Sequence, residues 1–190
     1  MNKINALLVE DTLDFNLEKQ LKDAGYAYFK IRPEDNSLNL VKELSPQLII
    51  FNVNTLTESI LLEFQKLSAY KALPCLIFAK AASTQIIDLA INTGISELII
   101  NDTKSIMLNS LINIAISRFK YQQDLKIALE EALEKLENRK LTDRAKAILI
   151  KTQNFSEDEA YHTLRKLAMN RKITLGEMAK NVIAMSELFK

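Results

Sequence analysis

The chain has 190 residues, 48% of them hydrophobic, and a formal net charge of +1 at pH 7. This length allows one ordinary domain and a smaller one, and the apolar fraction is sufficient for a packed core. Only three glycines and three prolines are present, which argues against a disordered or linker-rich protein. The charge is uneven, because residues 1–117 hold 13 acidic and 10 basic residues, whereas residues 118–190 hold 15 basic and 11 acidic ones.

Residues 1–117 alternate between short apolar runs and amphipathic stretches, which is typical of a parallel sheet covered on both faces. We predict strands at Asn5–Val9, Tyr26–Ile31, Leu48–Val53, Pro74–Ala79 and Glu97–Ile100. We predict helices at Thr12–Ala24, Ser37–Leu44, Glu58–Ser68 and Ser83–Asn92. Gly25 and Gly94 each follow a helix, where a left-handed closing residue is favoured. This order predicts a flavodoxin-like, doubly wound α/β domain.

The start of the chain, Met1–Glu10, has neither the apolar core nor the cleavage pattern of a signal peptide. No apolar stretch approaches the roughly 20 residues that a membrane-spanning helix needs. The lone cysteine, Cys75, lies in an apolar run and is expected to be a buried thiol. We therefore expect a cytoplasmic protein.

Five residues fall at or just after the C-terminal ends of predicted strands, where doubly wound folds bind their ligands. They are Glu10, Asp11, Asn52, Ala79 and Asn101. The segments that contain them, LLVED, SPQLIIFN, LPCLIFA and TGISELIIN, resemble strands of the CheY-like receiver domain of response regulators. A phosphorylating receiver needs an acidic pair for Mg²⁺, an aspartate nucleophile, a hydroxyl group and a lysine.

Only the acidic pair is present here. Asn52 stands in place of the aspartate, Ala79 in place of the hydroxyl residue and Asn101 in place of the lysine. An amide cannot attack a phosphoryl donor as a carboxylate does, and it brings no charge to a divalent metal. We interpret the five residues as a degenerate phosphoacceptor site in a pseudo-receiver, and we expect neither a metal nor another cofactor. Such a domain is expected to bind another protein.

A helical pattern begins near Lys104 and runs on, since neither glycine nor proline occurs between Gly94 and Gly176. Its first apolar positions would cover the sheet, and a narrower stripe follows at Leu125, Leu129, Leu133 and Leu136. Nothing in its own domain would bury that stripe, so a coiled-coil homodimer is expected. The spacing is not a regular heptad, and the alternative is that the helix folds back onto a C-terminal bundle.

Two capping boxes, Ser156 with Glu159 and Thr174 with Glu177, predict the starts of two further helices. Each helix carries small and apolar residues on one face at helical spacing, so both should pack with the end of the long helix as a three-helix bundle. The positions that share a face are Ala160, Leu164, Leu167 and Ala168 in the first, and Leu175, Ala179, Val182, Ile183 and Ser186 in the second.

The sequence from about Leu125 to Phe189 resembles the ANTAR domain, the RNA-binding module of the AmiR and NasT antitermination regulators. The resemblance is carried by Arg144–Lys146, Lys151, Ser156–Ala160, Leu164–Arg165, Ala168–Met169 and Ala179. Ala147 and Ile150 depart from it, because the family usually has Gly and Met there. The resemblance implies a non-enzymatic protein that binds stem-loops in a nascent leader transcript and so prevents a terminator from forming.

Basic residues outside the predicted core are the candidate RNA contacts. On the long helix, Lys140, Arg144 and Lys151 lie within about 40° of one another. On the next helix, Arg165, Met169 and Lys172 share the face opposite the apolar one, together with His162. The cations would pair with phosphates, the arginines could also read or stack on a base, and the methionine could contact a splayed base. The predicted RNA-binding residues are Arg144, Lys146, Lys151, Arg165, Lys166, Met169, Arg171 and Lys172.

We therefore predict a pseudo-receiver domain at residues 1–117, a coiled-coil linker helix at 118–138 and an ANTAR RNA-binding domain at 139–190. A ligand-sensing partner protein or dimerisation, and not aspartyl phosphorylation, is expected to control it. Two other classes stay open. The chain could be a dimeric DNA-binding transcription factor, because helices and charge alone do not distinguish an RNA loop from a major groove. It could also be a protein-interaction scaffold without catalytic activity.

Overall fold

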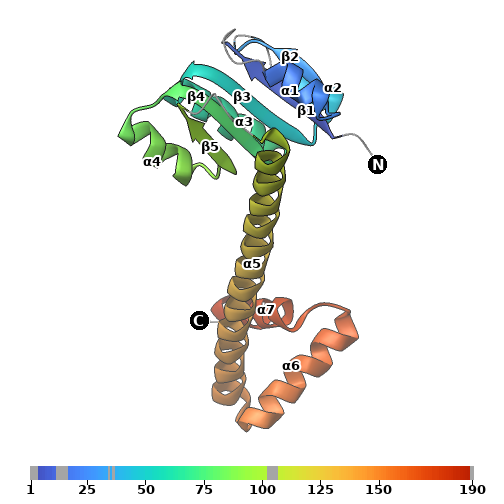
Figure 1. The fold of residues 1–190 in the computed structure, drawn as a ribbon. Helices are drawn as coiled ribbons and strands as arrows, with labels where there is room; N and C mark the ends of the chain where they lie inside the picture. The colour runs from blue at the N-terminus through green and yellow to red at the C-terminus, as the bar shows by residue number, and fades with distance from the viewer. Residues whose placement is uncertain (1–3, 12–16, 34, 36, 102–106, 189–190) are drawn as a thin grey trace. The chain divides into compact units, whose positions relative to one another are not determined.

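The computed structural model describes residues 4–11, 17–33, 35, 37–101 and 107–188 (Figure 1). The chain divides into two compact units, Met1–Gln123 and Asp124–Lys190. The boundary falls within a helix, so one helix contributes to the core of each unit.

The described part of the first unit contains a five-stranded parallel sheet with helices on both faces (Figure 1). Its strands are β1 (Asn5–Glu10), β2 (Ala27–Ile31), β3 (Leu48–Thr55), β4 (Cys75–Ala81) and β5 (Glu97–Ile100). The helices between them are α1 (Leu17–Asp23), α2 (Ser37–Leu44), α3 (Glu58–Tyr70) and α4 (Thr84–Asn92). The strand order β2-β1-β3-β4-β5 is that of the flavodoxin-like fold, which confirms the predicted fold class.

The predicted elements are confirmed with small differences at their ends. β3 and β4 each continue two residues beyond the predicted end. α4 begins at Thr84 because Ser83 is its N-cap and accepts a hydrogen bond from the Ile86 N–H at 3.3 Å. Gly25 and Gly94 have φ angles of 79° and 81°, as predicted for closing residues. The predicted start of the first helix and that of the long helix lie outside the described residues.

Two hydrophobic layers cover the sheet, because successive residues of a strand point to opposite faces. On one side, Leu7 and Phe51 pack with Phe64 of α3, and α2 and α4 contribute to the same core. On the other side, Leu8 and Ile50 pack in a core to which α1 and the long helix contribute. Both faces of the strands are therefore buried, as their nearly continuous apolar sequences require.

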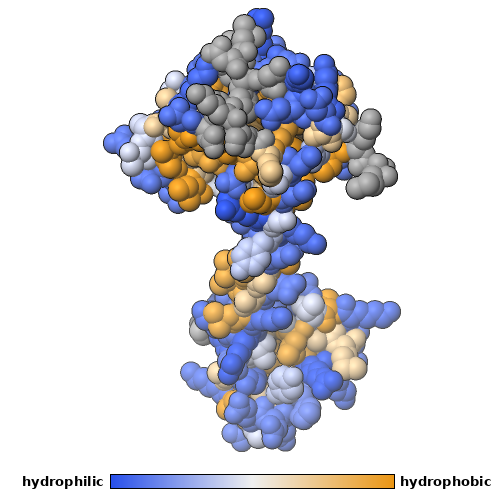
Figure 2. Space-filling view, in the orientation of Figure 1, coloured by the Kyte–Doolittle hydropathy of each residue, from blue (hydrophilic) through white to orange (hydrophobic). Residues whose placement is uncertain are grey.

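The long helix, α5 (Leu108–Gln153), has 46 residues. Its described residues from 124 to 137 are all exposed, and Figure 2 shows hydrophobic side chains at the surface of this helix. The four leucines of the predicted stripe are half exposed or more: Leu125 51%, Leu129 60%, Leu133 56% and Leu136 51%. The stripe is thus not buried by the C-terminal helices, contrary to the folded-back alternative. Among the described residues, neither α5 nor any other helix has the length and apolar character to span a membrane.

The second unit packs α6 (Glu157–Arg171) and α7 (Leu175–Leu188) against the end of α5. Its core contains small and apolar residues from all three helices, and the buried members are Ala145, Leu164, Ala168, Met178, Ala179 and Ile183. This is the predicted three-helix arrangement, in which small side chains allow the helices to approach closely.

Both predicted capping boxes are present at the starts of these helices. Ser156 Oγ accepts a hydrogen bond from the Glu159 N–H at 3.3 Å, and Glu159 Oε2 accepts one from the Ser156 N–H at 2.8 Å. Thr174 and Glu177 make the same reciprocal pair at 3.2 and 2.8 Å. Each box satisfies N–H groups that have no partner within the helix itself.

Gly176, near the start of α7, is buried against α5. A Cβ atom at this position would lie 2.0 Å from Oδ1 of Asn138 and 2.8 Å from its Cγ. The two helices therefore approach too closely here for any side chain unless Asn138 moves.

Candidate nucleic-acid interface and receiver site

The C-terminal ends of β1 and β3 bring Glu10 and Asn52 side by side. The two residues are register partners on adjacent strands. Both are buried, with 6% and 2% of their surface exposed. Nδ2 of Asn52 donates a hydrogen bond to Oε1 of Glu10 at 2.5 Å. The residue that stands in place of the nucleophile thus serves as a hydrogen-bond donor to a buried carboxylate.

The second partner of Glu10 is Lys30 of β2. Its Nζ lies 2.5 Å from Oε2 of Glu10 and 2.5 Å from Oε1 of Glu18 on α1. Tyr28 donates a further hydrogen bond to Oε2 of Glu18 at 3.0 Å. The hydrogen bonds to Glu10 and Glu18 raise the pKa of Lys30, and the hydrogen bond from Lys30 is the main reason why the pKa of Glu18 is lowered. One ammonium group therefore joins β2 to both β1 and α1.

The other three predicted site residues lie apart from this pair. Asp11 is exposed, and its Oδ1 accepts a hydrogen bond from the Asn54 N–H at 2.8 Å. Ala79 is buried in the core on the α2–α3–α4 side of the sheet. Asn101 is exposed and left-handed, with a φ of 57°, and its N–H donates to the Ala79 carbonyl at 3.0 Å. The five residues therefore share an edge of the sheet without forming one cluster of side chains.

The residues at this edge do not fit a Mg²⁺ ion of the kind that a phosphorylating receiver uses. Both carboxylate oxygens of Glu10 already have partners, and Asn52 directs an N–H donor at one of them. Mg²⁺ needs carboxylate oxygens that are free to bind it. In the part of the chain that the structure describes, no three His, Cys, Asp or Glu side chains gather as they would around a metal ion.

In the second unit, the outer side of α6 carries Arg165, Lys166 and Met169, all exposed. Met169 has 69% of its surface exposed, so it is an apolar side chain open to a ligand beside two cations. Neither cation forms an ion pair with another described side chain. The buried residues of α6 lie on its other side, so this surface is not needed to fold the unit.

Two of the predicted cations are already paired. Nη2 of Arg144 lies 2.8 Å from Oε1 of Glu187, which links α5 to α7. Nζ of Lys146 lies 2.9 Å from Asp143 and 2.8 Å from Glu157, and only 16% of its side chain is exposed. Hydrogen bonds to Glu157 and Asp143 raise the pKa of Lys146. Arg144 thus joins α5 to α7, and Lys146 joins α5 to α6.

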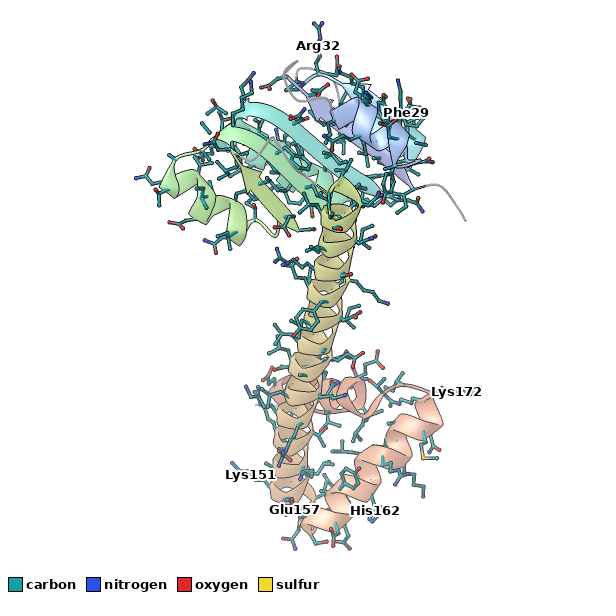
Figure 3. The ribbon with its side chains drawn as sticks, viewed as in Figure 1. Phe29, Arg32, Lys151, Glu157, His162 and Lys172 are labelled. Carbon is teal, nitrogen blue, oxygen red and sulfur yellow. The ribbon has the colours of Figure 1, made fainter. Side chains whose placement is uncertain are left out.

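The remaining predicted cations lie at helix ends. Figure 3 shows Lys172 at the end of α6 opposite to His162 and Glu157, and Lys151 near the end of α5. Lys172 is not part of the helical face from which it was predicted, because it is the C-cap of α6 with a left-handed φ of 55°. Arg171, the last helical residue, is exposed beside it. Arg171 and Lys172 thus extend the cationic surface of α6 past the end of the helix.

Lys30 is the functional candidate that the sequence analysis did not identify. Strand alternation places it on the same side of β2 as Tyr28, facing α1. A lysine in a strand that is covered by a helix needs a counter-ion, and this requirement could have identified Lys30 from the sequence. Its partners, Glu10 and Glu18, are 20 and 12 residues away in the sequence, so only the sheet register identifies them.

Residues 130–183 match the family model described as the ANTAR domain. The matched segment covers the end of α5, all of α6 and most of α7. It includes all eight predicted RNA-binding residues.

Two curated proteins are similar in sequence. The transcriptional regulatory protein PdtaR of Mycobacterium tuberculosis (strain ATCC 25618 / H37Rv) is 22% identical over 180 residues, which cover 93% of this chain and 88% of that protein. The nitrate regulatory protein of Klebsiella oxytoca is 32% identical over 68 residues, which cover 36% of this chain and 17% of that protein. Both names are those of regulatory proteins.

Among solved structures, the signal receiver domain of a modulated diguanylate cyclase from Desulfovibrio desulfuricans G20 is similar to the first unit. It aligns with a TM-score of 0.55 and 17% identity, and the alignment covers 64% of this chain and 99% of that chain. A likeness at this identity establishes the fold. The chain thus joins a receiver-like fold to a segment that matches the ANTAR domain, and over most of its length it is similar to a transcriptional regulatory protein.

Proposed function

We propose that this regulator binds RNA and acts in transcription antitermination, by binding stem-loops in nascent leader transcripts. The observation that carries the proposal is the outer side of α6, where Arg165, Lys166 and Met169 are exposed within the matched ANTAR segment. Arg171 and Lys172 continue this surface. Unpaired cations bind phosphates, and an exposed apolar side chain among them can contact an unstacked base.

Competition binding tests the class of ligand. A labelled hairpin from a leader transcript recovered by cross-linking to the full-length protein in cells would be competed with the same hairpin and with duplex DNA of the same sequence. We expect the unlabelled hairpin to compete and the duplex to compete only weakly at moderate salt. Equal competition would indicate a DNA-binding factor, and recovery of no RNA would indicate a protein-interaction scaffold.

Control by a partner protein or by dimerisation, and not by aspartyl phosphorylation, is the second part of the proposal. It is supported by Asn52, whose amide is no nucleophile and is hydrogen-bonded to Glu10. Intact-mass measurement after incubation with acetyl phosphate and Mg²⁺ should show no phosphoryl adduct on the protein. A stoichiometric adduct would refute this part and leave RNA binding untouched.

The exposed leucine stripe of α5 supports a homodimer. Leu129 and Leu133 are exposed by 60% and 56% although they lie on one helix face, which is the arrangement that a coiled coil buries. Light scattering coupled to size exclusion should report a dimer for the unmodified protein and a monomer for Leu129→Lys with Leu133→Lys. Ile127→Lys is the matched control, because Ile127 is 53% exposed on the opposite side of the same helix. A monomeric unmodified protein would contradict the dimer.

A further inference from the structure

The buried carboxylate of Glu10 requires compensation of its charge. The side chain of Glu10 is only 4% exposed, whereas that of Lys30 is 35% exposed. A buried charge without a partner is strongly destabilising, so some cation or set of donors must accompany this group. In a receiver that is phosphorylated, a divalent cation at this end of the sheet has that role.

The contacts of Glu10 are complete without a metal. Oε1 accepts from Asn52 and Oε2 pairs with Lys30, both at 2.5 Å. Lys30 in turn is held by Glu18, so its ammonium lies between two carboxylates from two different elements. The nearest acidic neighbour along the chain, Asp11, accepts a hydrogen bond from the N–H of Asn54 near the end of β3.

Lys30 reaches this position from the edge strand of the sheet. It is the register partner of Leu8, two residues before Glu10 on β1, and side chains two apart on a strand share a face. A lysine side chain is long enough to span that offset and to keep part of its stem exposed. The position of the ammonium is thus fixed by the sheet register and by Glu18.

We propose that Lys30 is a built-in cation that takes the place of the divalent ion in this receiver fold. The buried charge of Glu10 is then compensated within the chain, and the receiver-like unit is held in one state that responds neither to Mg²⁺ nor to a phosphoryl donor. This inference concerns the first unit alone and does not depend on RNA binding.

The test compares thermal unfolding of the full chain in chelator and in millimolar Mg²⁺. The unmodified protein should unfold at the same temperature in both. Lys30→Met should unfold at a lower temperature in chelator and recover part of the loss with Mg²⁺, because Glu10 is left without its cation. Lys22→Met is the matched control, since Lys22 lies over the Tyr28 ring at 5.9 Å and does not contact Glu10. Its unfolding temperature should be the same with and without Mg²⁺.

A second variant keeps the test independent of how well Lys30→Met folds. Glu10→Gln combined with Lys30→Met removes both charges, so this double variant should fold. Its unfolding temperature should not change with Mg²⁺ if the ion acts at Glu10. The binding of Mn²⁺, followed by its electron paramagnetic resonance signal, should be absent from the unmodified protein and present in Lys30→Met. Mn²⁺ binding by the unmodified protein, or a Lys30→Met protein that neither binds Mn²⁺ nor recovers with Mg²⁺, would overturn the proposal.

Discussion

At the end of the receiver-like sheet, Glu10 is buried and both of its oxygens have partners, whereas on α6 Arg165 and Lys166 are exposed and pair with no described side chain. The charged groups of the first arrangement pair with one another, whereas the two cations of the second are open to a ligand. Arg144 and Lys146 lie in the ANTAR segment but follow the first pattern, since both pair with acidic residues. We therefore expect the partners of a cation, and not only its place in a basic segment, to decide whether it binds a ligand.

Charge reversal on α6 should have the largest effect. Arg165→Glu with Lys166→Glu should weaken hairpin binding by about 100-fold, because each lost contact is worth about 1.4 kcal/mol or more. The salt dependence of binding should also fall by about 1.4 in slope, or about 0.7 for each phosphate contact. Fluorescence anisotropy at several salt concentrations measures both quantities.

The matched control for that variant makes the same change of charge in the first unit. Lys42→Glu with Lys66→Glu, on α2 and α3, should leave hairpin affinity nearly unchanged. An equal loss from both double variants would mean that only the net charge of the protein matters, and the contrast between the two regions would no longer hold.

Gly176→Ala tests how closely the second unit is packed. Overpacking costs about 1–3 kcal/mol, and the better helix propensity of alanine returns up to about 1 kcal/mol, so a net loss of stability is expected. Adding Asn138→Ala removes the atom at 2.0 Å and should restore stability to the unmodified level or above. Urea unfolding measures the difference, and a Gly176→Ala protein more stable than the unmodified one would mean that the Asn138 side chain moves aside without cost.

Acid should weaken the helices of the second unit through their capping boxes. Hydrogen bonds from the Ser156 N–H and the Thr174 N–H lower the pKa of Glu159 and Glu177 from the ordinary value of 4.5. A lowered pKa gives stability that is present above pH 4.5 and is lost as the pH falls through the folded-state value. Circular dichroism on acid titration should therefore show less loss of helix in Glu159→Gln with Glu177→Gln, because glutamine keeps the cap without titrating.

The control for the acid titration is a pair of glutamates outside any cap. Glu134→Gln with Glu137→Gln, in the exposed stretch of α5, should leave the acid transition where it is in the unmodified protein. If the two double variants behave alike, the capping boxes do not account for the acid sensitivity.

The smallest effect is expected from the paired cations. Arg144→Ala removes one ion pair and Lys146→Ala removes two, and each pair is worth up to about 1 kcal/mol of stability. Each should change hairpin affinity by less than about threefold, on the order of the 0.6 kcal/mol thermal energy. If Lys146→Ala reduced affinity as much as Arg165→Ala, the distinction between paired and unpaired cations would be wrong.

Local sequence signals predicted most of the fold. The capping boxes, the glycines after α1 and α4 and the alternation of apolar runs depend on neighbours a few residues away, and the structure confirms them. α2 was predicted to the residue, at Ser37–Leu44, because its amphipathic stretch is bounded on both sides.

The site was less accessible to sequence reasoning because its contacts join distant residues. Glu10 and Asn52 could be placed at one sheet edge, but their hydrogen bond and the participation of Lys30 follow from strand register. Helical periodicity placed Lys172 on the outer face of α6, although the helix ends one residue earlier. Whether the predicted cations bind RNA stays a prediction.

The left-handed backbone of Lys172 has a consequence for any attempt to improve this protein. A lysine pays about 1 kcal/mol in this conformation that glycine would not. A library of variants selected only for resistance to heat should accordingly accumulate glycine at position 172. The selected variants would then lack the positive charge at the end of α6. Heat resistance and ligand binding would then favour different residues at position 172.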